Sequence, residues 1–355
     1  MLQVALAGDD PFYAMEGPSL AGPLRRDCAA PVLRGGNRSS PVFSDPSVFP
    51  HAVWLSAVWT ADGETVHGLV HDEYHGDRAL NGTSSCPGTC WYTTVLQVVS
   101  TNGGRSFTYA TSPSNPRGIA IASPVGYQPA PSELKEPQGL PNHHIVQDPR
   151  DGFIYILVSC SENAFLPAAG IHGGHCVYRS TPETIGDGLA AWHGWDGHGW
   201  NATVVDPYAS PAPATAGHLP AHVGSGIEGS GGIVFVEKFG LFVAVGAHCS
   251  QAEGQPPTMH VMYETSPNMT TWSGVLSGPA VPLLAPTVTC ASIYPHLIDA
   301  ASPSRNFDVI GNSSTSATVF FSVIVGDQVP GPVPHKQLSR AGLFIPVTIE
   351  LAEAA

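Results

Sequence analysis

The feature that most constrains the fold of this chain is a loose repeat of short apolar strands separated by polar turns. The clearest copy begins at Asp45, runs through apolar segments at 51–59 and 66–74, and closes with 91–100 and the turn 102–104. Apolar and polar residues alternate in the last of these segments, as they do in a half-buried strand. The pattern therefore predicts an all-β protein.

Further copies of this theme follow along the chain. Their first strands are expected at 142–146, 232–236 and 292–297, and the segment 2–17 resembles the last strands of one more copy. Four copies and a partial one predict a five-bladed β-propeller of four-stranded antiparallel blades, the first truncated at its N terminus. We expect a single domain over 1–355, with blades over 1–41, 42–112, 140–204, 222–276 and 290–351. A β-sandwich is the alternative, which the aromatic-ended copies disfavour.

Composition agrees with this interpretation. The chain has 39 Gly and 34 Pro, which suit tight turns between strands, and only 12% of its residues are charged. The net charge of −14, with few and scattered Lys and Arg, argues against a nucleic-acid partner. No apolar run approaches the roughly 20 residues of a membrane span. Long Pro-rich connections at 112–141 and 206–220 are expected to carry function or to lie on the surface.

Cysteines and glycosylation sequons predict an exported protein. There are seven cysteines, and N-x-S/T sequons begin at Asn37, Asn81, Asn201, Asn268 and Asn312. The alternative is that Asn, Ser and Thr merely share turns. No signal peptide is visible in the first residues, so we expect one to have been removed or to be missing from this sequence.

The expected disulfides join Cys86 to Cys90, Cys160 to Cys176, and Cys249 to Cys290, with Cys28 unpaired. Zinc bound by Cys86 and Cys90 is the competing interpretation of the first pair.

Several segments carry a resemblance to known propellers: 17–20, 45–47, 69–76, 90–92, 195–200 and 302–307. Together they resemble an uncharacterised family of secreted five-bladed propellers, which is similar to the arabinanase, fructosidase and levansucrase type of glycoside hydrolase. Relatives carry one more strand before the equivalent of Leu2. The resemblance implies a carbohydrate partner, and it identifies a fold and not a substrate.

A second resemblance concerns turns. Residues 100–107 are similar to the Asp-box turn of sialidases and other propellers, and 266–268 with Trp272 form a degraded version. Such boxes are structural hairpin turns at the outer edge of a blade. A sialidase would need an arginine triad, and no arginine here lies in a recognisable sialidase motif, so this activity ranks lower.

Glycoside hydrolysis requires one protonated and one ionised carboxyl group. Asp45 opens an inner strand, and its counterpart in the hydrolase-type propellers is the general base or nucleophile; a turn-capping Asp before Pro is the alternative. Glu228, in a glycine-rich segment before an inner strand, is the expected general acid, and Glu162 is the alternative acid. Glu73 is the third predicted catalytic carboxylate.

The densest polar cluster is 71–75. Strand alternation predicts that His71, Glu73 and His75 share one face, whereas Asp72 and Tyr74 share the other. Contact with sugar hydroxyls is expected for the first face, ahead of a metal site. No cofactor is predicted, with calcium or another divalent ion in the channel as the alternative.

Three further residues at inner strands are expected to bind substrate: His143, Tyr294 and His296. Trp91, Trp195 and Trp200 either stack on sugar rings or serve in packing.

The sequence thus supports two functions. One is a secreted glycoside hydrolase whose Asp45, Glu73 and Glu228 meet at one face of a central channel. The other is a non-catalytic carbohydrate-binding or cell-surface propeller, because no motif is diagnostic of catalysis.

Overall fold

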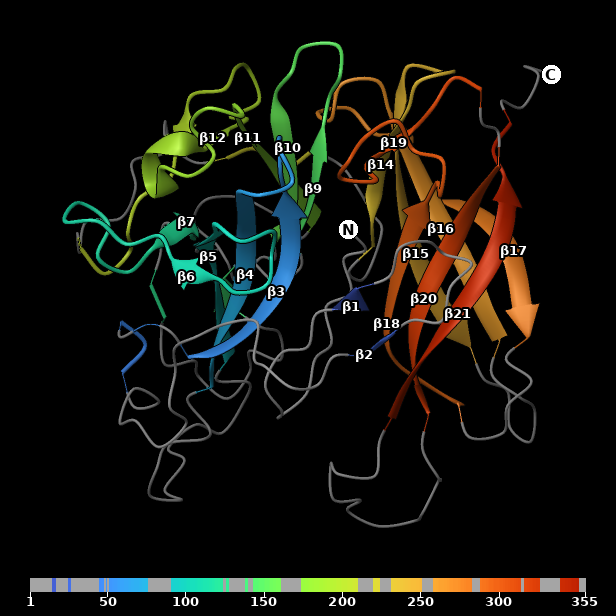
Figure 1. Cartoon of the computed structure of the whole chain (residues 1–355), viewed down its shortest axis with the longest axis horizontal. Coiled ribbons are helices and arrows are strands. Elements are labelled where there is room, and N and C mark those ends of the chain that lie inside the picture. Colours follow the sequence, from blue (N-terminus) through green and yellow to red (C-terminus); the bar gives the residue numbers. More distant parts are fainter. Residues whose placement is uncertain are drawn as a thin grey trace. The chain divides into compact units, whose positions relative to one another are not determined.

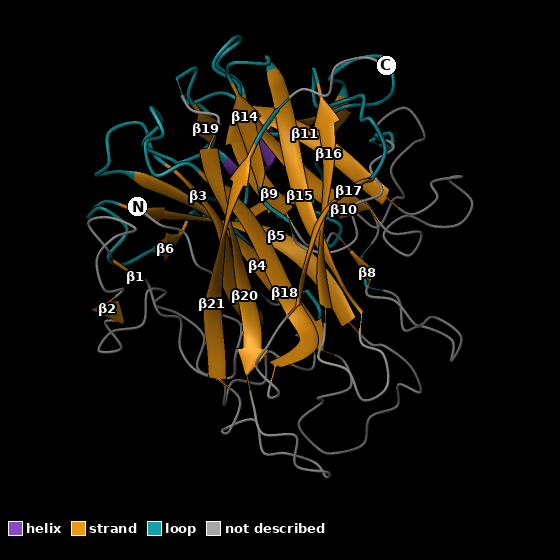
Figure 2. Cartoon of the chain, turned by 90° about the vertical axis from the view of Figure 1, so that its right-hand side faces the viewer, coloured by secondary structure: helices purple, strands orange, loops and turns teal. Residues whose placement is uncertain are grey.

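The computed structural model describes residues 15–16, 25–26, 45–47, 49, 51–75, 91–123, 126–127, 138–139, 143–160, 174–209, 220–223, 231–250, 258–282, 288–313, 316–325 and 339–350. The chain divides into two compact units, Met1–Val223 and Gly224–Ala355. Within the described residues the regular structure consists of strands and one short 3-10 helix, η4 (Gly188–Ala191) (Figures 1 and 2). The predicted all-β class is confirmed.

The first large sheet of the first unit is built on three long antiparallel strands: β3 (Ala52–Trp59), β4 (Val66–His75) and β5 (Trp91–Ser100). The free edge of β5 pairs successively with three short strands: β6 (Thr108–Tyr109), β7 (Ile119–Ile121) and β8 (Gln138–Gly139). These three pieces together occupy the position of a fourth strand. A two-stranded sheet of β1 (Met15–Glu16) and β2 (Arg25–Arg26) lies earlier in the chain.

The second large sheet of this unit is antiparallel throughout. Its strands are β9 (His143–Gln147), β10 (Ile154–Cys160), β11 (Gly174–Ser180), β12 (His193–Gly194) and β13 (Ala202–Thr203). Cys160 and Cys176 form a disulfide between β10 and β11, with their Cα atoms 5.7 Å apart, as predicted. The other predicted pairings lie outside the described residues, because Cys28, Cys86 and Cys90 are not described and neither are the side chains of Cys249 and Cys290.

The second unit contains two sheets. One has β14 (Ile233–Val236), β15 (Leu241–Ser250), β16 (Thr258–Ser266) and β17 (Leu276–Pro282) in antiparallel order, with β19 (Val309–Ile310) parallel to β14. The other has β18 (Val288–Ile298), β20 (Ser316–Val325) and β21 (Ser339–Thr348).

The molecule therefore consists of multiple antiparallel sheets. Their described strands do not follow a uniform four-stranded plan, since the sheets have two, five, five, three and six strands. The five- and six-stranded sheets exceed four strands because short segments are added at their edges, such as β6, β7 and β8 on β5, which turn signals in a sequence do not reveal. The number of blades, their predicted bounds and their closure round one axis stay predictions.

Each unit buries its own apolar core. In the first unit, Trp59, Ile121, Ile156, Tyr178 and Trp192 belong to one buried cluster that joins strands of both large sheets to the 3-10 helix. In the second unit, the corresponding cluster is made of short aliphatic side chains from both sheets: Val236, Val243, Val261, Leu297, Ile310 and Val319. Burial of this apolar surface is the main favourable term in folding each unit.

The predicted Asp-box turn is a hairpin turn between β5 and β6, as expected. The Asn102 side-chain oxygen accepts a hydrogen bond from the Ser106 backbone N–H at 3.0 Å, and the Ser100 hydroxyl accepts one from Gly104 N–H at 2.9 Å. Gly103 and Gly104 have positive φ of 69° and 82°, which favours glycine. Phe107, directly after the turn, is buried.

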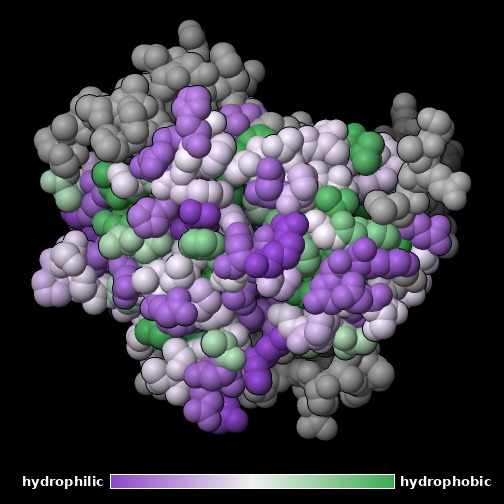
Figure 3. All heavy atoms as spheres, turned by 90° about the horizontal axis from the view of Figure 1, so that it is seen from above, coloured by the Kyte–Doolittle hydropathy of each residue, from purple (hydrophilic) through white to green (hydrophobic). Residues whose placement is uncertain are grey.

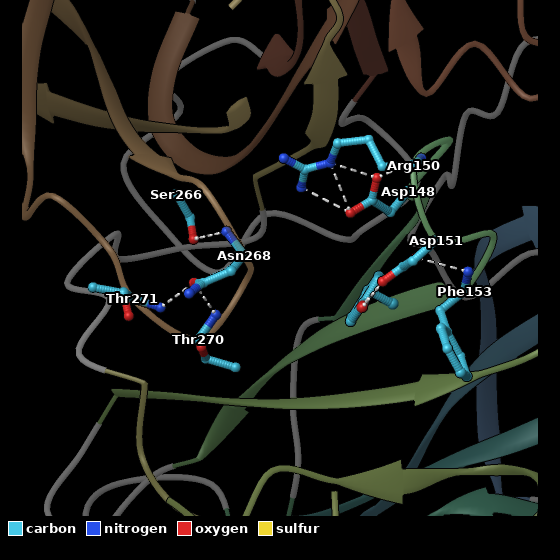
Figure 4. Close-up of polar contacts among 9 residues, drawn as sticks. Asp148, Arg150, Asp151, Phe153, Ser266, Asn268, Thr270 and Thr271 are labelled. Carbon is cyan, nitrogen blue, oxygen red and sulfur yellow. Dashed lines mark hydrogen bonds and ion pairs between the residues drawn. The ribbon is translucent and has the colours of Figure 1, made fainter. Parts of the chain in front are cut away.

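The degraded version at 266–268 forms the turn between β16 and β17 (Figure 4). The Asn268 side-chain oxygen accepts hydrogen bonds from the backbone N–H groups of Thr270 and Thr271, at 3.1 and 3.0 Å. Turns of this kind also close the β9–β10 hairpin, where Asp151 accepts a hydrogen bond from Phe153 N–H. Asx turns thus recur at the hairpins of both units.

The surface mixes polar and apolar residues. On the face drawn in Figure 3, hydrophilic residues (purple) lie among apolar ones (green). No helix in the described part of the chain is long and apolar enough to span a membrane.

Gly68 provides a test of the packing between β3, β4 and β5. A Cβ atom at this buried position would lie 2.7 Å from Val98 Cγ2 and 2.9 Å from Leu55 Cδ1. We expect Gly68→Ala to lower the free energy of unfolding by about 1–3 kcal/mol, because the core must shift to admit the methyl group. Urea unfolding measures this loss, and the exposed Thr101→Ala serves as the control, with a change within about 0.5 kcal/mol. Equal unfolding midpoints for Gly68→Ala and the wild type would contradict the packing described here.

Candidate functional site

A buried ion pair between His51 and Asp72 lies at the centre of the candidate site. His51 directly precedes β3, and Asp72 lies near the end of β4. One Asp72 oxygen accepts a hydrogen bond from the His51 backbone N–H at 2.6 Å, and the other accepts one from His51 Nδ1 at 2.7 Å. The two side chains are 0% and 1% exposed. The pair therefore fixes both the backbone and the ring of His51 on β4.

The hydrogen bonds of His51 define its charge. Its second ring nitrogen, Nε2, lies 3.1 Å from the backbone carbonyl oxygen of Asp45. Since a carboxylate and a carbonyl both accept, the ring must donate from both nitrogens, as only the imidazolium form does. Burial lowers the pKa of His51, but the hydrogen bond and charge of Asp72, aided by Asp45, outweigh burial and raise this pKa above its ordinary value.

Asp45 is an exposed carboxylate in a fixed orientation. Its Oδ1 accepts hydrogen bonds from the Ser47 backbone N–H at 2.8 Å and from the Ser47 hydroxyl at 2.7 Å. These two bonds hold the pKa of Asp45 below its ordinary value, and the charges of His51 and Arg117 add to the effect. Asp45 is therefore ionised at neutral pH. The turn-capping geometry that the sequence offered as the alternative role is present, and the carboxylate is still open to solvent.

A second ion pair holds the same turn from another direction. Arg117 donates from Nη1 to Asp206 Oδ2 at 2.6 Å and from Nε to the Ser47 backbone carbonyl at 2.9 Å. Asp206 in turn accepts a hydrogen bond from Tyr208 N–H at 2.9 Å. Three segments far apart in the sequence are thus tied together at the turn that carries Asp45.

Five aromatic rings lie close to the His51–Asp72 and Arg117–Asp206 ion pairs. Tyr74 lies edge-on to His51 and to Tyr127, at centroid distances of 5.1 and 5.0 Å. Tyr208 lies 6.1 Å from Tyr92 and 5.9 Å from Phe49. Tyr92 is 2% exposed, whereas Phe49, Tyr127 and Tyr208 are partly exposed. Asp45, His51, Asp72, Arg117, Asp206 and these five rings are called the Asp45 cluster below.

Sequence reasoning identified only Asp45 of this cluster as catalytic. It placed Asp72 and Tyr74 on one face of β4, and both contact His51, whereas His71 and Glu73 share the other face with 3.6 Å between their polar atoms. The predicted alternation is confirmed. The same alternation puts Glu73 on the opposite face of β4 from Asp72, so Glu73 is not among the residues that hold Asp45.

The remaining predicted site residues lie elsewhere or outside the described part of the chain. Glu228 and Glu162 are not described, and neither are the side chains of His75, His143 and Tyr294. His296 belongs to β18 in the second unit, where its ring lies against Gly232. Burial of the ring lowers the pKa of His296 to about 4, so this imidazole is neutral at pH 7.

His51, Arg117, Tyr127, Asp206 and Tyr208 were missed from the sequence. The available signal was the pair of long Pro-rich connections, which contain all of them except His51. Among the described residues, no group of three or more His, Cys, Asp or Glu side chains lies close enough to hold a metal ion.

Comparison with known proteins gives distant structural likenesses. No family model matches the chain, and no curated protein matches it. A thermostable family-43 glycoside hydrolase matches with a TM-score of 0.40 at 10% identity, over 96% of this chain and 83% of its own. An N-acetylgalactosamine deacetylase from F. plautii matches with a TM-score of 0.39 at 12% identity, over 82% of this chain and 71% of its own. The α-L-arabinanase of Cellvibrio cellulosa matches with a TM-score of 0.32 at 8% identity, over 81% of this chain and 71% of its own. Glycoside hydrolases are thus among the structural neighbours, and at these TM-scores they assign neither a family nor an activity.

The raised pKa of His51 predicts a particular pH dependence of stability. The His51–Asp72 pair contributes fully below the unfolded-state pKa of about 6.5, and its contribution is lost as the pH rises through the higher folded-state pKa. We expect the free energy of unfolding of the wild type to fall over this alkaline window. His51→Gln should remove that fall, and the exposed His193→Gln should leave it unchanged. Urea unfolding at pH 6 to 9 measures both; the same pH slope in His51→Gln and the wild type would refute the assignment.

Proposed function

We propose that the chain is a glycoside-hydrolase-like protein that acts on a poly- or oligosaccharide, with Asp45 as its ionised carboxylate. The observation that carries this proposal is the state of Asp45: exposed, of lowered pKa, and held in one orientation by Ser47 and by the contact of its backbone with His51. A hydrolytic base or nucleophile must be ionised and oriented before the substrate arrives.

The surroundings of Asp45 suit a sugar. Phe49, Tyr127 and Tyr208 are partly exposed rings, and the apolar face of a sugar ring packs on such surfaces. The charged pair Arg117–Asp206 beside Tyr208 offers donors and acceptors of the kind that sugar hydroxyls use. This combination of aromatic faces and fixed charges supports a carbohydrate ligand over an apolar one.

The general acid of the reaction is proposed to be Glu228. Hydrolysis requires a second carboxyl group that is protonated and lies across the scissile bond from Asp45. Glu162 is the alternative acid. Glu73, whose neighbour on β4 is His71 at 3.6 Å, is the third proposed catalytic carboxylate. We further propose that the protein is a secreted, glycosylated five-bladed propeller that needs no cofactor, as its sequence indicates.

A non-catalytic carbohydrate-binding function is the second candidate. It is favoured by the Asx turn of Asp45, which by itself explains an Asp two residues before a Ser. The two functions share a ligand class and differ in whether the Asp45 charge is needed for turnover.

Asp45→Asn separates the two functions. Asparagine keeps the size of the side chain, the Oδ1 acceptor for Ser47 and the backbone carbonyl for His51, and it removes only the negative charge. We expect at least a hundredfold loss of glycosidase turnover with the melting temperature preserved, because general base catalysis alone contributes about 10²–10⁴-fold. Release of reducing sugar from arabinan, xylan, β-glucan and levan measures turnover.

Asp62→Asn is the matched control. Asp62 is likewise exposed and caps a turn, accepting hydrogen bonds from Glu64 and Thr65 N–H, but it lies outside the Asp45 cluster. It should retain full turnover. An Asp45→Asn variant with wild-type turnover would refute the catalytic role, and a wild type that binds these polysaccharides without cleaving any of them would favour the binding function.

A further inference from the structure

A second group of aromatic residues lies on the sheet β9–β13, away from the strand that carries Asp72. Arg179, on β11, lies over two rings: its Cζ lies 4.0 Å from the centroid of Phe153 and 4.5 Å from that of Trp200. Trp200 also makes edge contacts with Trp195 and Tyr155, each at 5.5 Å. Phe153, Arg179, Trp195 and Trp200 are all partly exposed, and they are called the Arg179 platform below.

The loop that carries Trp195 and Trp200 is held by Asp196. The carboxylate accepts hydrogen bonds from the backbone N–H groups of His198 and Gly199, at 2.8 and 2.7 Å, and from the Asn201 side chain at 3.0 Å. These hydrogen bonds lower the pKa of Asp196 to about 2, and the bond from Asn201 has the largest effect. The loop between Trp195 and Trp200 is therefore fixed before any ligand binds, which lowers the entropic cost of binding.

The charge of Arg179 is the feature that points to a ligand. The guanidinium groups of Arg117 and Arg150 each contact a carboxylate, Asp206 at 2.6 Å and Asp148 at 2.8 Å. Among the described residues Arg179 has no carboxylate within ion-pair distance. Its polar neighbour is the Tyr155 hydroxyl, which donates to Asp151 at 2.6 Å. A guanidinium carries five N–H donors, so contact with the two rings and with the Tyr155 hydroxyl leaves further N–H groups that can bind an anion as a fork.

We infer that the Arg179 platform binds an anionic sugar residue, carboxylated or sulfated, of a polysaccharide. The edge of the Arg179 guanidinium binds the anionic group, and the partly exposed indoles of Trp195 and Trp200 pack against the sugar ring. Charge complementarity selects this ligand, because the Arg179 cation lies against partly exposed aromatic rings and, unlike Arg117 and Arg150, has no described carboxylate within ion-pair distance. The inference concerns a site separate from Asp45 and does not depend on catalysis there.

The test is affinity electrophoresis of the full chain through gels that contain polygalacturonate, its fully methyl-esterified form, or κ-carrageenan. We expect retardation by at least one polyanion, weakened by salt, and much less by the esterified polymer, which has the same backbone without the charge. Retardation by polygalacturonate alone assigns a carboxylated ligand, and retardation by carrageenan alone assigns a sulfated one. Both outcomes support the anionic site.

Variants then locate the site. Arg179→Gln should weaken binding about tenfold or more, and Arg179→Lys, which keeps the charge but loses the planar stack, should also weaken it. The exposed Arg105→Gln should bind as the wild type does. Circular dichroism checks that each variant is folded. The inference is overturned if no polyanion retards the wild type, if the esterified polymer binds as well as the charged one, or if Arg179→Gln and Arg105→Gln bind equally.

Discussion

The Asp45 cluster depends on the buried charge pair of His51 and Asp72. A buried carboxylate is tolerated in a protein interior when it is paired and hydrogen-bonded, and Asp72 uses both of its oxygens on one residue. His51 then donates a second hydrogen bond, from Nε2, to the backbone carbonyl oxygen of Asp45. The buried charge of Asp72 thus orients His51, and His51 holds the backbone of the turn that carries the exposed Asp45 carboxylate.

Two other constraints act on the same turn. Arg117 fixes the Ser47 carbonyl from the connection between β6 and β7, and Asp206 orients Arg117 from the segment that follows β13. Tyr127 comes from the segment between β7 and β8, and Tyr208 comes from the segment after β13. A hydrogen bond from Tyr127 N–H to the Tyr208 hydroxyl, at 3.2 Å, joins the two residues. The long Pro-rich connections therefore contribute to the site, and the sheets serve as the frame that brings them together.

The sequence predicts the local features well because their causes are local. Alternation along 71–75 follows from strand geometry, the 100–107 turn from its Gly-Gly pair and Asx side chain, and the Cys160–Cys176 bond from two neighbouring strands. The edge strands β6, β7 and β8 were not predicted, since two or three residues carry no periodicity. The pairing of His51 with Asp72, and of Arg117 with Asp206, was also missed, because these partners are 21 and 89 residues apart. The first pair meets through the pairing of β3 with β4, and the second joins connections that belong to two different sheets. For Glu73, the sequence predicted the correct face of β4. It did not predict that the opposite face, through Asp72 and His51, holds the turn of Asp45.

The central claim is that a protonated His51, paired with Asp72, holds an ionised Asp45. Nuclear magnetic resonance of the folded wild type tests it directly, through the ring nitrogen shifts of His51 and the carboxyl carbon shift of Asp45 as the pH is varied. We expect both His51 nitrogens to be protonated at pH 7 and Asp45 to titrate below its ordinary pKa of 3.8. A neutral His51 ring at pH 7, or an Asp45 that titrates at or above 3.8, would contradict the account.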